Sequence, residues 1–199
     1  NIGAAHAQTR YLCFINPDCR PCRNFFLKGL AAVKKNPDAC LVPIFEEGTG
    51  RVISGCQPGY TRSKLLADIF ETDYHIHLCH WLSNRFHDQS WFWPHGACFF
   101  MSRQVFHDLQ GFDVSYFLYM EDVDLGRRFS EKGGRVQVFP EKIFHAVGRS
   151  CKHHAVNPRL WLDKSRVRYA LKHHGFLFGL FLWLLTIPSR GYRKLALRA

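Results

Sequence analysis

Short apolar runs alternate with a segment of helical spacing in the first part of the chain. Residues 11–15 (YLCFI) form a continuous apolar run, which is typical of a strand buried on both faces, and residues 40–45 form a second such strand. Between them, residues 24–35 repeat apolar side chains at the spacing of a helix. A short strand is expected near Val52 and Ile53. The order strand, helix, strand predicts parallel strands joined through a helix.

The apolar pattern is irregular over residues 55–89 and becomes regular again from residue 91. Residues 55–89 lack a clear period and are rich in His, Arg and Asp, which predicts an irregular loop of the kind that often carries binding function. An acidic first turn and a Gly133-Gly134 stop are typical of the ends of a helix. The elements expected here are an apolar strand-like run at 91–101, helices at 102–109 and 121–132, strands at 135–139 and 142–147, and helices from Pro158 onward.

This alternation predicts an α/β fold with a mostly parallel sheet flanked by helices. A chain of 199 residues is long enough for one domain with a sizeable core. We expect the α/β domain to occupy residues 1–157 and a helical tail to occupy residues 158–199.

Most of the net charge lies in the last quarter of the chain, which includes that tail. The formal net charge is +11, and from Arg149 to the end there are eleven Lys and Arg but one acid, Asp163, which is +10. The preceding residues therefore carry only about +1. A basic tail on a nearly neutral body indicates an anionic partner surface, either lipid headgroups or nucleic acid, with a solvated basic helix as the alternative.

An apolar segment inside the tail separates these possibilities. Residues 176–188 (FLFGLFLWLLTIP) would form a helix of about 20 Å, which is shorter than a bilayer core of roughly 30 Å. Basic residues on both sides favour a helix lying in the membrane interface, and packing against the domain is the alternative. Nucleic acid is not expected as a partner, because no aromatic stacking platform accompanies the charge. The expected membrane residues are Phe176, Phe178, Leu180, Phe181, Trp183 and Leu184.

The eight cysteines show no regular framework, so free thiols are expected. Cys19 and Cys22 have the spacing of a zinc or redox pair, but no second pair follows at zinc-site spacing.

Three polar features stand out as candidates for chemistry. Asp18 follows a predicted strand, His145 closes another, and residues 121–124 (EDVD) place three carboxylates at a helix start. Ligands of α/β folds bind at the carboxyl ends of strands. Each feature also has an ordinary structural explanation, as a turn residue, a packed imidazole or a complement to the helix dipole.

In combination these residues resemble glycosyltransferase family 2, in particular its rhamnosyltransferase-like branch, which has the GT-A fold and builds bacterial surface polysaccharides. The resemblance covers roughly residues 1–172. It rests on the motifs at residues 14–18 (FINPD), 96–106 (GACFFMSRQVF), 109–113 (LQGFD), 117–128 (FLYMEDVDLGRR) and 143–145 (IFH), followed by Gly148 and Ser150.

The resemblance implies a divalent cation, Mg²⁺ or Mn²⁺, held by Asp18 and His145. Asn16 stands where the fuller pattern has a first Asp. Carboxylate oxygen suits either ion, and such a cation assists departure of a nucleotide diphosphate.

The resemblance also implies that Asp122 is the base that deprotonates the acceptor hydroxyl. Glu121 and Asp124 would support it, and Arg128 would contact either the diphosphate or a carboxylate within the fold. Residues expected to line the acceptor cleft are Trp93, His95, Gly96 and Ala97.

The expected activity is therefore inverting transfer of a sugar, rhamnose or another hexose, from a nucleotide-diphosphate donor to a polyprenyl-linked saccharide. The expected location is peripheral, on the cytoplasmic face of a bacterial inner membrane. The family also has an N-terminal βαβ unit that holds the nucleotide, which this sequence is expected to lack. The alternative is an inactive, truncated relative that serves as a membrane-associated binding protein.

Overall fold

The computed structural model describes residues 1–48, 50–74, 87–146 and 158–196, which divide into two compact units. The first unit comprises residues 1–59, 89–113 and 121–154, and the second comprises residues 60–88, 114–120 and 155–199. The expected tail thus belongs to a larger unit that also includes two earlier segments. The boundary expected between residues 157 and 158 stays a prediction, because residues 147–157 lie outside the described residues.

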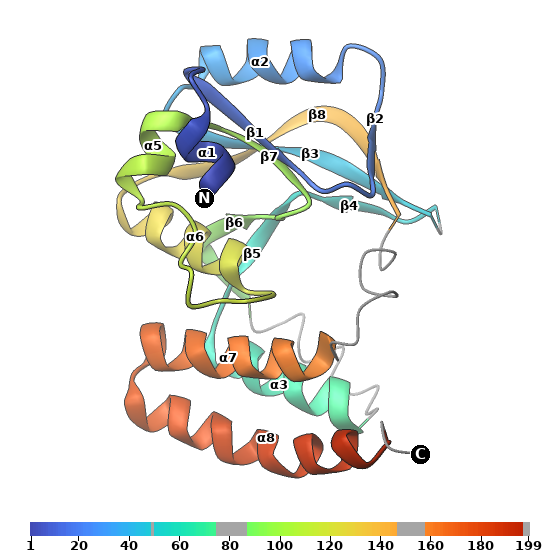
Figure 1. The fold of residues 1–199 in the computed structure, drawn as a ribbon, viewed down its shortest axis with the longest axis vertical. Helices are drawn as coiled ribbons and strands as arrows, with labels where there is room; N and C mark the ends of the chain where they lie inside the picture. The colour runs from blue at the N-terminus through green and yellow to red at the C-terminus, as the bar shows by residue number, and fades with distance from the viewer. Residues whose placement is uncertain (49, 75–86, 147–157, 197–199) are drawn as a thin grey trace. The chain divides into compact units, whose positions relative to one another are not determined.

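A mixed sheet forms the centre of the first unit (Figure 1). Its strands are ordered β1-β7-β3-β8-β2, and β4 pairs with β3 beside this path. The bounds are β1 Tyr11–Ile15, β2 Cys19–Pro21, β3 Ala39–Glu47, β4 Val52–Ser54, β7 Cys98–Ser102 and β8 Arg135–His145. The expected α/β class is confirmed.

The expectation of a mostly parallel sheet is wrong for the described strands. Among the pairs described for this six-stranded sheet, only β3 and β8 are parallel, and β7 is antiparallel to both β1 and β3. The strand-helix-strand order did predict that β1 and β3 run in the same direction. It could not show that a strand from much later in the chain is inserted between them.

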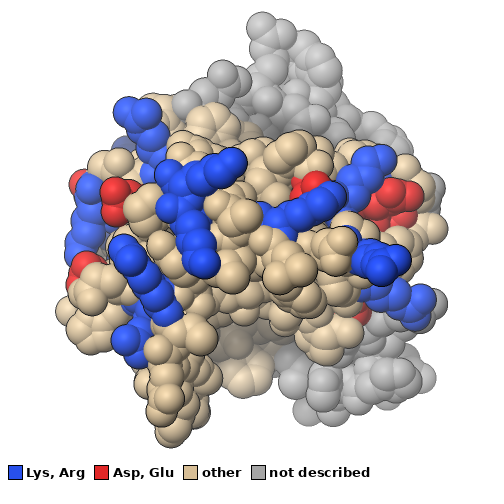
Figure 2. Space-filling view, turned by 90° about the horizontal axis from the view of Figure 1, so that it is seen from above, with Lys and Arg blue, Asp and Glu red and all other residues tan. Residues whose placement is uncertain are grey.

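Helices cover both faces of this sheet. On one face lies α2 (Phe25–Lys35), and on the other lie α1 (Ile2–His6), α5 (Arg103–Asp108) and α6 (Glu121–Glu131) (Figure 1). The expected helices at 24–35, 102–109 and 121–132 are confirmed to within about one residue. The face over α2 carries many basic side chains and fewer acidic ones (Figure 2).

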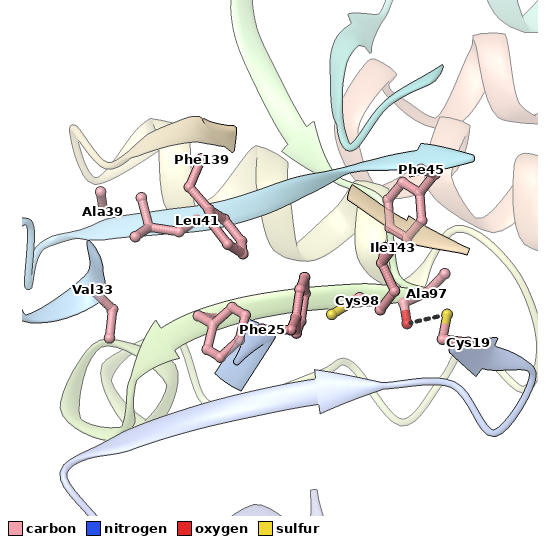
Figure 3. Packing of buried hydrophobic residues seen from close by; sticks show 11 residues of the cluster. Cys19, Phe25, Val33, Ala39, Leu41, Phe45, Ala97, Cys98, Phe139 and Ile143 are labelled. Atoms are coloured by element: carbon pink, nitrogen blue, oxygen red, sulfur yellow. Dashed lines mark hydrogen bonds between the residues drawn. The ribbon is translucent and has the colours of Figure 1, made fainter. Parts of the chain in front are cut away.

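The central strands send alternate side chains into two separate cores. Leu41 and Phe25 belong to the core under α2 (Figure 3). Phe100 is part of the same core, with its ring centre 5.7 Å from that of Phe25. Cys40 and Phe99 belong to the opposite core, beneath α5 and α6. Each large side chain buried in this way contributes about 1.5–3 kcal/mol. This arrangement explains the continuous apolar runs of β3 and β7, because both of their faces are covered.

Two expectations about single strands are corrected. β1 is only partly buried, because it lies at the end of the described strand order. The strands expected at 135–139 and 142–147 are one strand, β8, whose pairing with β3 shifts register between Val42 and Ile44. Pro140 therefore falls at an irregularity in the ladder, where the missing N–H is tolerated.

The expected irregular loop at 55–89 is largely regular where it is described. It contains β5 (Cys56–Tyr60), α3 (Arg62–Tyr74) and the start of β6 (His87–Pro94), while residues 75–86 lie outside the described residues. β5 and β6 form a separate two-stranded sheet. Leu65 and Ile69, four residues apart and fully buried, are the helical signal that the polar composition concealed.

Three helices make up most of the second unit: α3, α7 (Pro158–His174) and α8 (Phe176–Ala196). A buried ion network joins α3 to α7. The Lys64 ammonium contacts the Asp68 carboxylate, and Arg166 Nη2 lies 3.2 Å from Asp68 Oδ2. Asp163 is also buried, and its Oδ1 lies 3.9 Å from Arg166 Nη1. The network thus places two buried cations beside two buried anions, so its net charge is close to zero.

Only one side of α8 packs within the second unit. Leu182 and Thr186 are fully buried, whereas Phe176, Leu180, Phe181, Trp183 and Leu184 are exposed. Phe178 is partly covered, with the Arg62 guanidinium 5.5 Å from its ring centre. The expected packing of the tail thus occurs on one side of α8, and the other side leaves apolar side chains exposed. The expected association with a membrane stays a prediction. Across the described residues we find no helix with the length and hydropathy needed to span a bilayer.

Candidate active site

The candidate site is built where three strands end together. β1 and β8 run in the same direction as β3, so their carboxyl ends lie at one edge of the sheet. Asp18 follows β1, and His145 is the last residue of β8. The turn at residues 95–97 enters β7 from the same edge, where Cys98 pairs with Ile15.

Strand pairing brings Asp18 and His145 into contact. The register of β2 against β8 places Cys19 opposite His145, and the backbone N–H of Ala146 donates to the Asp18 carbonyl at 3.1 Å. His145 Nε2 consequently lies 3.5 Å from Asp18 Oδ1. His145 is 7% exposed, and its Nδ1 has no hydrogen-bond partner among the described residues.

These two side chains fit the divalent cation that the resemblance implies. Two ligands that share an octahedral ion of this size are separated by roughly 3 Å, close to the observed distance. Carboxylate and imidazole both bind Mn²⁺, and Mg²⁺ prefers the oxygen. The ligand atoms of Asp18, His145 and Cys19 all lie within 4.8 Å of one another.

Cys19 was considered in the sequence only as a zinc or redox pair with Cys22, and not as a neighbour of Asp18 and His145. Its Sγ donates to the Ala97 carbonyl at 3.4 Å, as the dashed line in Figure 3 shows. Burial, and then the charge of Asp18, raise its pKa to about 11, so the thiol keeps its proton at neutral pH. Sulfur is a soft ligand that suits Mg²⁺ and Mn²⁺ poorly, and this thiol already donates to a backbone carbonyl, so we assign Cys19 to the core beneath the site.

His95 links the Asp18–His145 pair to the turn that precedes β7. Its ring centre lies 5.8 Å from that of His145 and 4.9 Å from that of Phe45. Burial, and then the proximity of His145, lower the pKa of His95 to about 4, so this imidazole is neutral at pH 7. The Ala97 N–H donates to His95 Nδ1 at 3.2 Å, which places the ring hydrogen on Nε2.

Asp122 is held against the same turn by two backbone donors. The Gly96 N–H donates to Asp122 Oδ2 at 2.9 Å, and the Val123 N–H donates to Oδ1 at 2.8 Å. A Cβ atom at Gly96 would lie 2.9 Å from that Oδ2 atom, so the approach requires glycine. Asp122 and His145 thus both contact the turn at residues 95–97, through Gly96 and His95 respectively, and Asp18 lies next to His145.

The environment of Asp122 makes it a stronger base than an ordinary aspartate. Burial raises the pKa of Asp122 to about 6, although its two backbone hydrogen bonds act in the opposite direction. Burial, and then the charge of Asp122, raise the pKa of Glu121 to about 7. Glu121 Oε2 is buried with no hydrogen-bond partner among the described residues. Two adjacent acids with raised pKa values are typical of a catalytic site.

The backbone before these acids is strained. Tyr119 and Met120, with φ of 67° and 66°, directly precede Glu121. A left-handed conformation costs a non-glycine residue of order 1–3 kcal/mol, and such residues cluster at functional sites. Neither residue type signals this turn in the sequence.

Asp124 and Arg128 have a structural role within the first unit. Arg128 Nε donates to Asp124 Oδ2 at 2.7 Å, and its Nη2 donates to the Gly111 carbonyl at 2.9 Å. Arg128 Nη1 donates to the carbonyl of Leu109. Asp124 is fully buried. Of the two expected uses of Arg128, the contacts favour pairing with a carboxylate in the fold, which fastens α6 to the end of α5.

Of the four residues expected to line the acceptor cleft, three are partly exposed and one is buried in the core. Trp93 is half-buried, donates its ring N–H to the Pro58 carbonyl at 3.0 Å, and lies against Gly126 of α6. His95 and Gly96 are also partly exposed at the turn. Ala97, at 2% exposed, is part of the core, so its side chain does not reach a cleft. Gly148 and Ser150 of the recognised motif lie outside the described residues.

Two acids with raised pKa values and a carboxylate–imidazole pair at one edge of an α/β sheet define a candidate catalytic site. The glycosyl transferase family group 2 model matches residues 23–197, so the chain belongs to this family.

Two curated relatives share part of this sequence. The N-acetylglucosaminyl-diphospho-decaprenol L-rhamnosyltransferases of two Mycobacterium tuberculosis strains, CDC 1551 / Oshkosh and ATCC 25618 / H37Rv, are each 49% identical to the chain over 95 residues. The matched region is 47% of this chain and 31% of each relative, so the chain spans about a third of the curated relatives' length.

The fold is also similar to that of a solved glycosyltransferase. The crystal structure of GalNAc-T7 with UDP, GalNAc and Mn²⁺ aligns with a TM-score of 0.55 and 17% identity. The alignment covers 85% of this chain and 33% of that one. At this identity the similarity shows a shared GT-A fold.

Proposed function

We propose that the protein is a metal-dependent inverting glycosyltransferase that moves rhamnose or another hexose from a nucleotide-diphosphate donor to a polyprenyl-linked saccharide. The observation that carries the proposal is the Asp122 carboxylate, fixed by Gly96 and Val123 beside the Asp18–His145 pair. The M. tuberculosis relatives, whose name specifies rhamnose and a diphospho-decaprenol acceptor, support this choice of donor and acceptor.

In this proposal Asp122 accepts the proton of the acceptor hydroxyl as that oxygen attacks the anomeric carbon. A single base on the acceptor side, opposite the leaving group, gives inversion. The two backbone N–H donors fix the carboxylate while each oxygen keeps a further lone pair for the incoming proton. Glu121, with its raised pKa, carries a proton for part of the time at pH 7, which limits negative charge beside the base.

Asp18 and His145 would hold the divalent cation. When bound, the cation neutralises charge on the departing nucleotide diphosphate. Neutral His95 adds no positive charge next to these ligands, so it does not compete with a cation.

The experiment that tests the proposal is a transfer assay with the full-length gene product. We expect the protein to move sugar from one member of a nucleotide-diphosphate hexose panel to a polyprenyl-diphosphate-linked N-acetylglucosamine. We also expect chelation of divalent cations to stop transfer and added Mn²⁺ or Mg²⁺ to restore it. Absence of transfer from every donor, with vesicle binding retained, would instead favour a membrane-associated binding protein.

We further propose that the protein is peripheral on the cytoplasmic face of a bacterial inner membrane. The exposed apolar side chains of α8 support this location, since an apolar helix face flanked by basic residues is typical of interfacial binding. Leu177, at 80% exposed, and Leu184, at 51%, lie on that face.

Leu184→Glu is expected to lower binding to anionic vesicles by about 10-fold or more, because it removes a buried leucine from the bilayer and adds a repelled charge. Flotation with vesicles of zwitterionic and anionic lipid measures the effect. Val52→Glu is the matched control, since Val52 is also exposed at 51% but lies on β4. Equal loss in both variants, or none in Leu184→Glu, would contradict the assignment.

A further inference from the structure

The second unit contains a cleft that the proposed chemistry does not use. Its volume is about 580 Å³, within the range of pockets that enclose one small ligand. One wall comes from residues 114–120 through Ser115 and Phe117, a second from α7, and a third from Trp183 of α8.

Aromatic rings form the apolar part of this cleft. Phe117 and Trp161 have ring centres 4.5 Å apart, and Trp183 lines the cleft from α8. Phe117 is 67% exposed and Trp183 is 41% exposed. Large aromatic side chains gathered and left exposed at one concave place indicate a ligand with apolar surface.

Cations form the polar part. Lys164, Arg168 and Lys172 all line the cleft, and their spacing of four residues places them along one face of α7. Like charges at this spacing repel one another, so the row favours an anionic ligand. No carboxylate is among the residues that line the cleft.

The acid and the other cation of this part of α7 are engaged elsewhere. Asp163 and Arg166 are buried and belong to the ion network with Asp68. Lys164 Nζ lies 4.3 Å from the centre of the Trp161 ring, and Lys172 Nζ lies 5.9 Å from that of Tyr116. Arg168 has no ion-pair partner among the described residues. With three cations and no carboxylate in its lining, the cleft has a basic rim over an aromatic floor.

We propose that this cleft binds the phosphate end of a prenyl diphosphate lipid. The diphosphate would contact Lys164, Arg168 and Lys172, and the first isoprene units would pack on Phe117, Trp161 and Trp183. The concave shape, with room for one small ligand, favours a single lipid over a flat layer of phospholipid headgroups. The choice of a prenyl chain rests on the proposed lipid-linked acceptor, whereas the preference for a lipid phosphate rests on the cleft itself.

Farnesyl diphosphate is a suitable probe, with inorganic diphosphate and farnesol as its two halves. Binding to the full-length protein is followed through the ¹⁵N–¹H indole resonances of Trp161 and Trp183, which Trp161→Phe and Trp183→Phe identify. We expect farnesyl diphosphate to shift both resonances and to bind at least about 10-fold more tightly than either half, because each half makes only one kind of contact.

The combined Lys164→Gln and Arg168→Gln substitutions are expected to weaken this binding by about 10-fold or more. Arg159→Gln is the matched control, because Arg159 is an exposed cation of α7 that does not line the cleft. All three substituted residues are exposed, so thermal unfolding should remain near that of the wild type.

Inorganic diphosphate that binds as tightly as farnesyl diphosphate would overturn the proposal in favour of a simple anion site. Anionic vesicles that shift the two resonances where farnesyl diphosphate does not would overturn it in favour of a membrane surface. Equal binding by the double variant and the wild type would also overturn it. The measurement needs no donor sugar, so Asp122→Asn should bind the probe normally even if it transfers nothing, which separates this proposal from the proposed activity.

Discussion

Asp122→Asn is expected to reduce sugar transfer by about 100- to 10,000-fold, the usual contribution of a positioned general base. The amide is nearly isosteric with the carboxylate but cannot accept the acceptor proton. Its oxygen can keep one of the two backbone hydrogen bonds from Gly96 and Val123. Loss of the other bond is offset because burial disfavours the charged carboxylate, so the melting temperature should change by only a few degrees.

The pH dependence of the wild type follows from the same environment. Because the pKa of Asp122 is raised to about 6, the base is ionised above that pH and protonated below it. We therefore expect kcat/KM to fall as the pH drops through about 6, rather than near the ordinary aspartate value of roughly 4. The low-pH limb should disappear from the residual activity of Asp122→Asn.

Glu131→Gln provides the matched control, since it neutralises an exposed acid near the other end of the same helix. Its activity should remain within about twofold of the wild type, because the exposed Arg127–Glu131 pair contributes little. Transfer by Asp122→Asn at more than a tenth of the wild-type rate would remove Asp122 from the mechanism.

Asp18→Asn is expected to weaken Mn²⁺ binding by at least about 100-fold and to reduce metal-dependent transfer accordingly. The amide keeps the size of the side chain but loses the negative charge that a divalent cation requires next to His145. His145→Gln should act in the same direction, since it replaces the imidazole ligand. Direct titration with Mn²⁺, followed by electron paramagnetic resonance of the free ion, measures the affinity.

Cys19→Ala tests whether the sulfur next to Asp18 and His145 also binds the metal. Cys19 lies within the same group of atoms, but its thiol donates to the Ala97 carbonyl. We therefore expect Mn²⁺ affinity to stay within about threefold of the wild type. A loss as large as that of Asp18→Asn would show that the sulfur is a ligand.

Local pattern predicted most of the elements in the first unit. The apolar runs at β3 and β7 and the helical spacing of α2 and α6 are strong signals, because the pattern of apolar side chains can be read within each segment. The meeting of Asp18 and His145 was predictable as well, since strands that run the same way end at one edge of a sheet.

Features that depend on distant partners were not predictable from one sequence. Nothing in β7 itself shows that it pairs between β1 and β3. Likewise, α3 was obscured because Lys64 and Asp68, which would ordinarily mark a solvated segment, are buried as an ion pair. The Asp124–Arg128 pair is different, because its spacing of four residues on a predicted helix was a readable signal for a structural contact.

The central claim, that a metal at Asp18 and His145 adjoins the turn that holds Asp122, is tested most directly by Mn²⁺ broadening of backbone amide resonances. At substoichiometric Mn²⁺ we predict strong broadening of the Gly96 amide. The Gly133 amide should be almost unaffected, because it precedes β8, an 11-residue strand about 30 Å long with His145 at its far end. Asp18→Asn should abolish the difference. Equal broadening at both glycines, or a sharp Gly96 resonance with Gly133 broadened, would contradict the account.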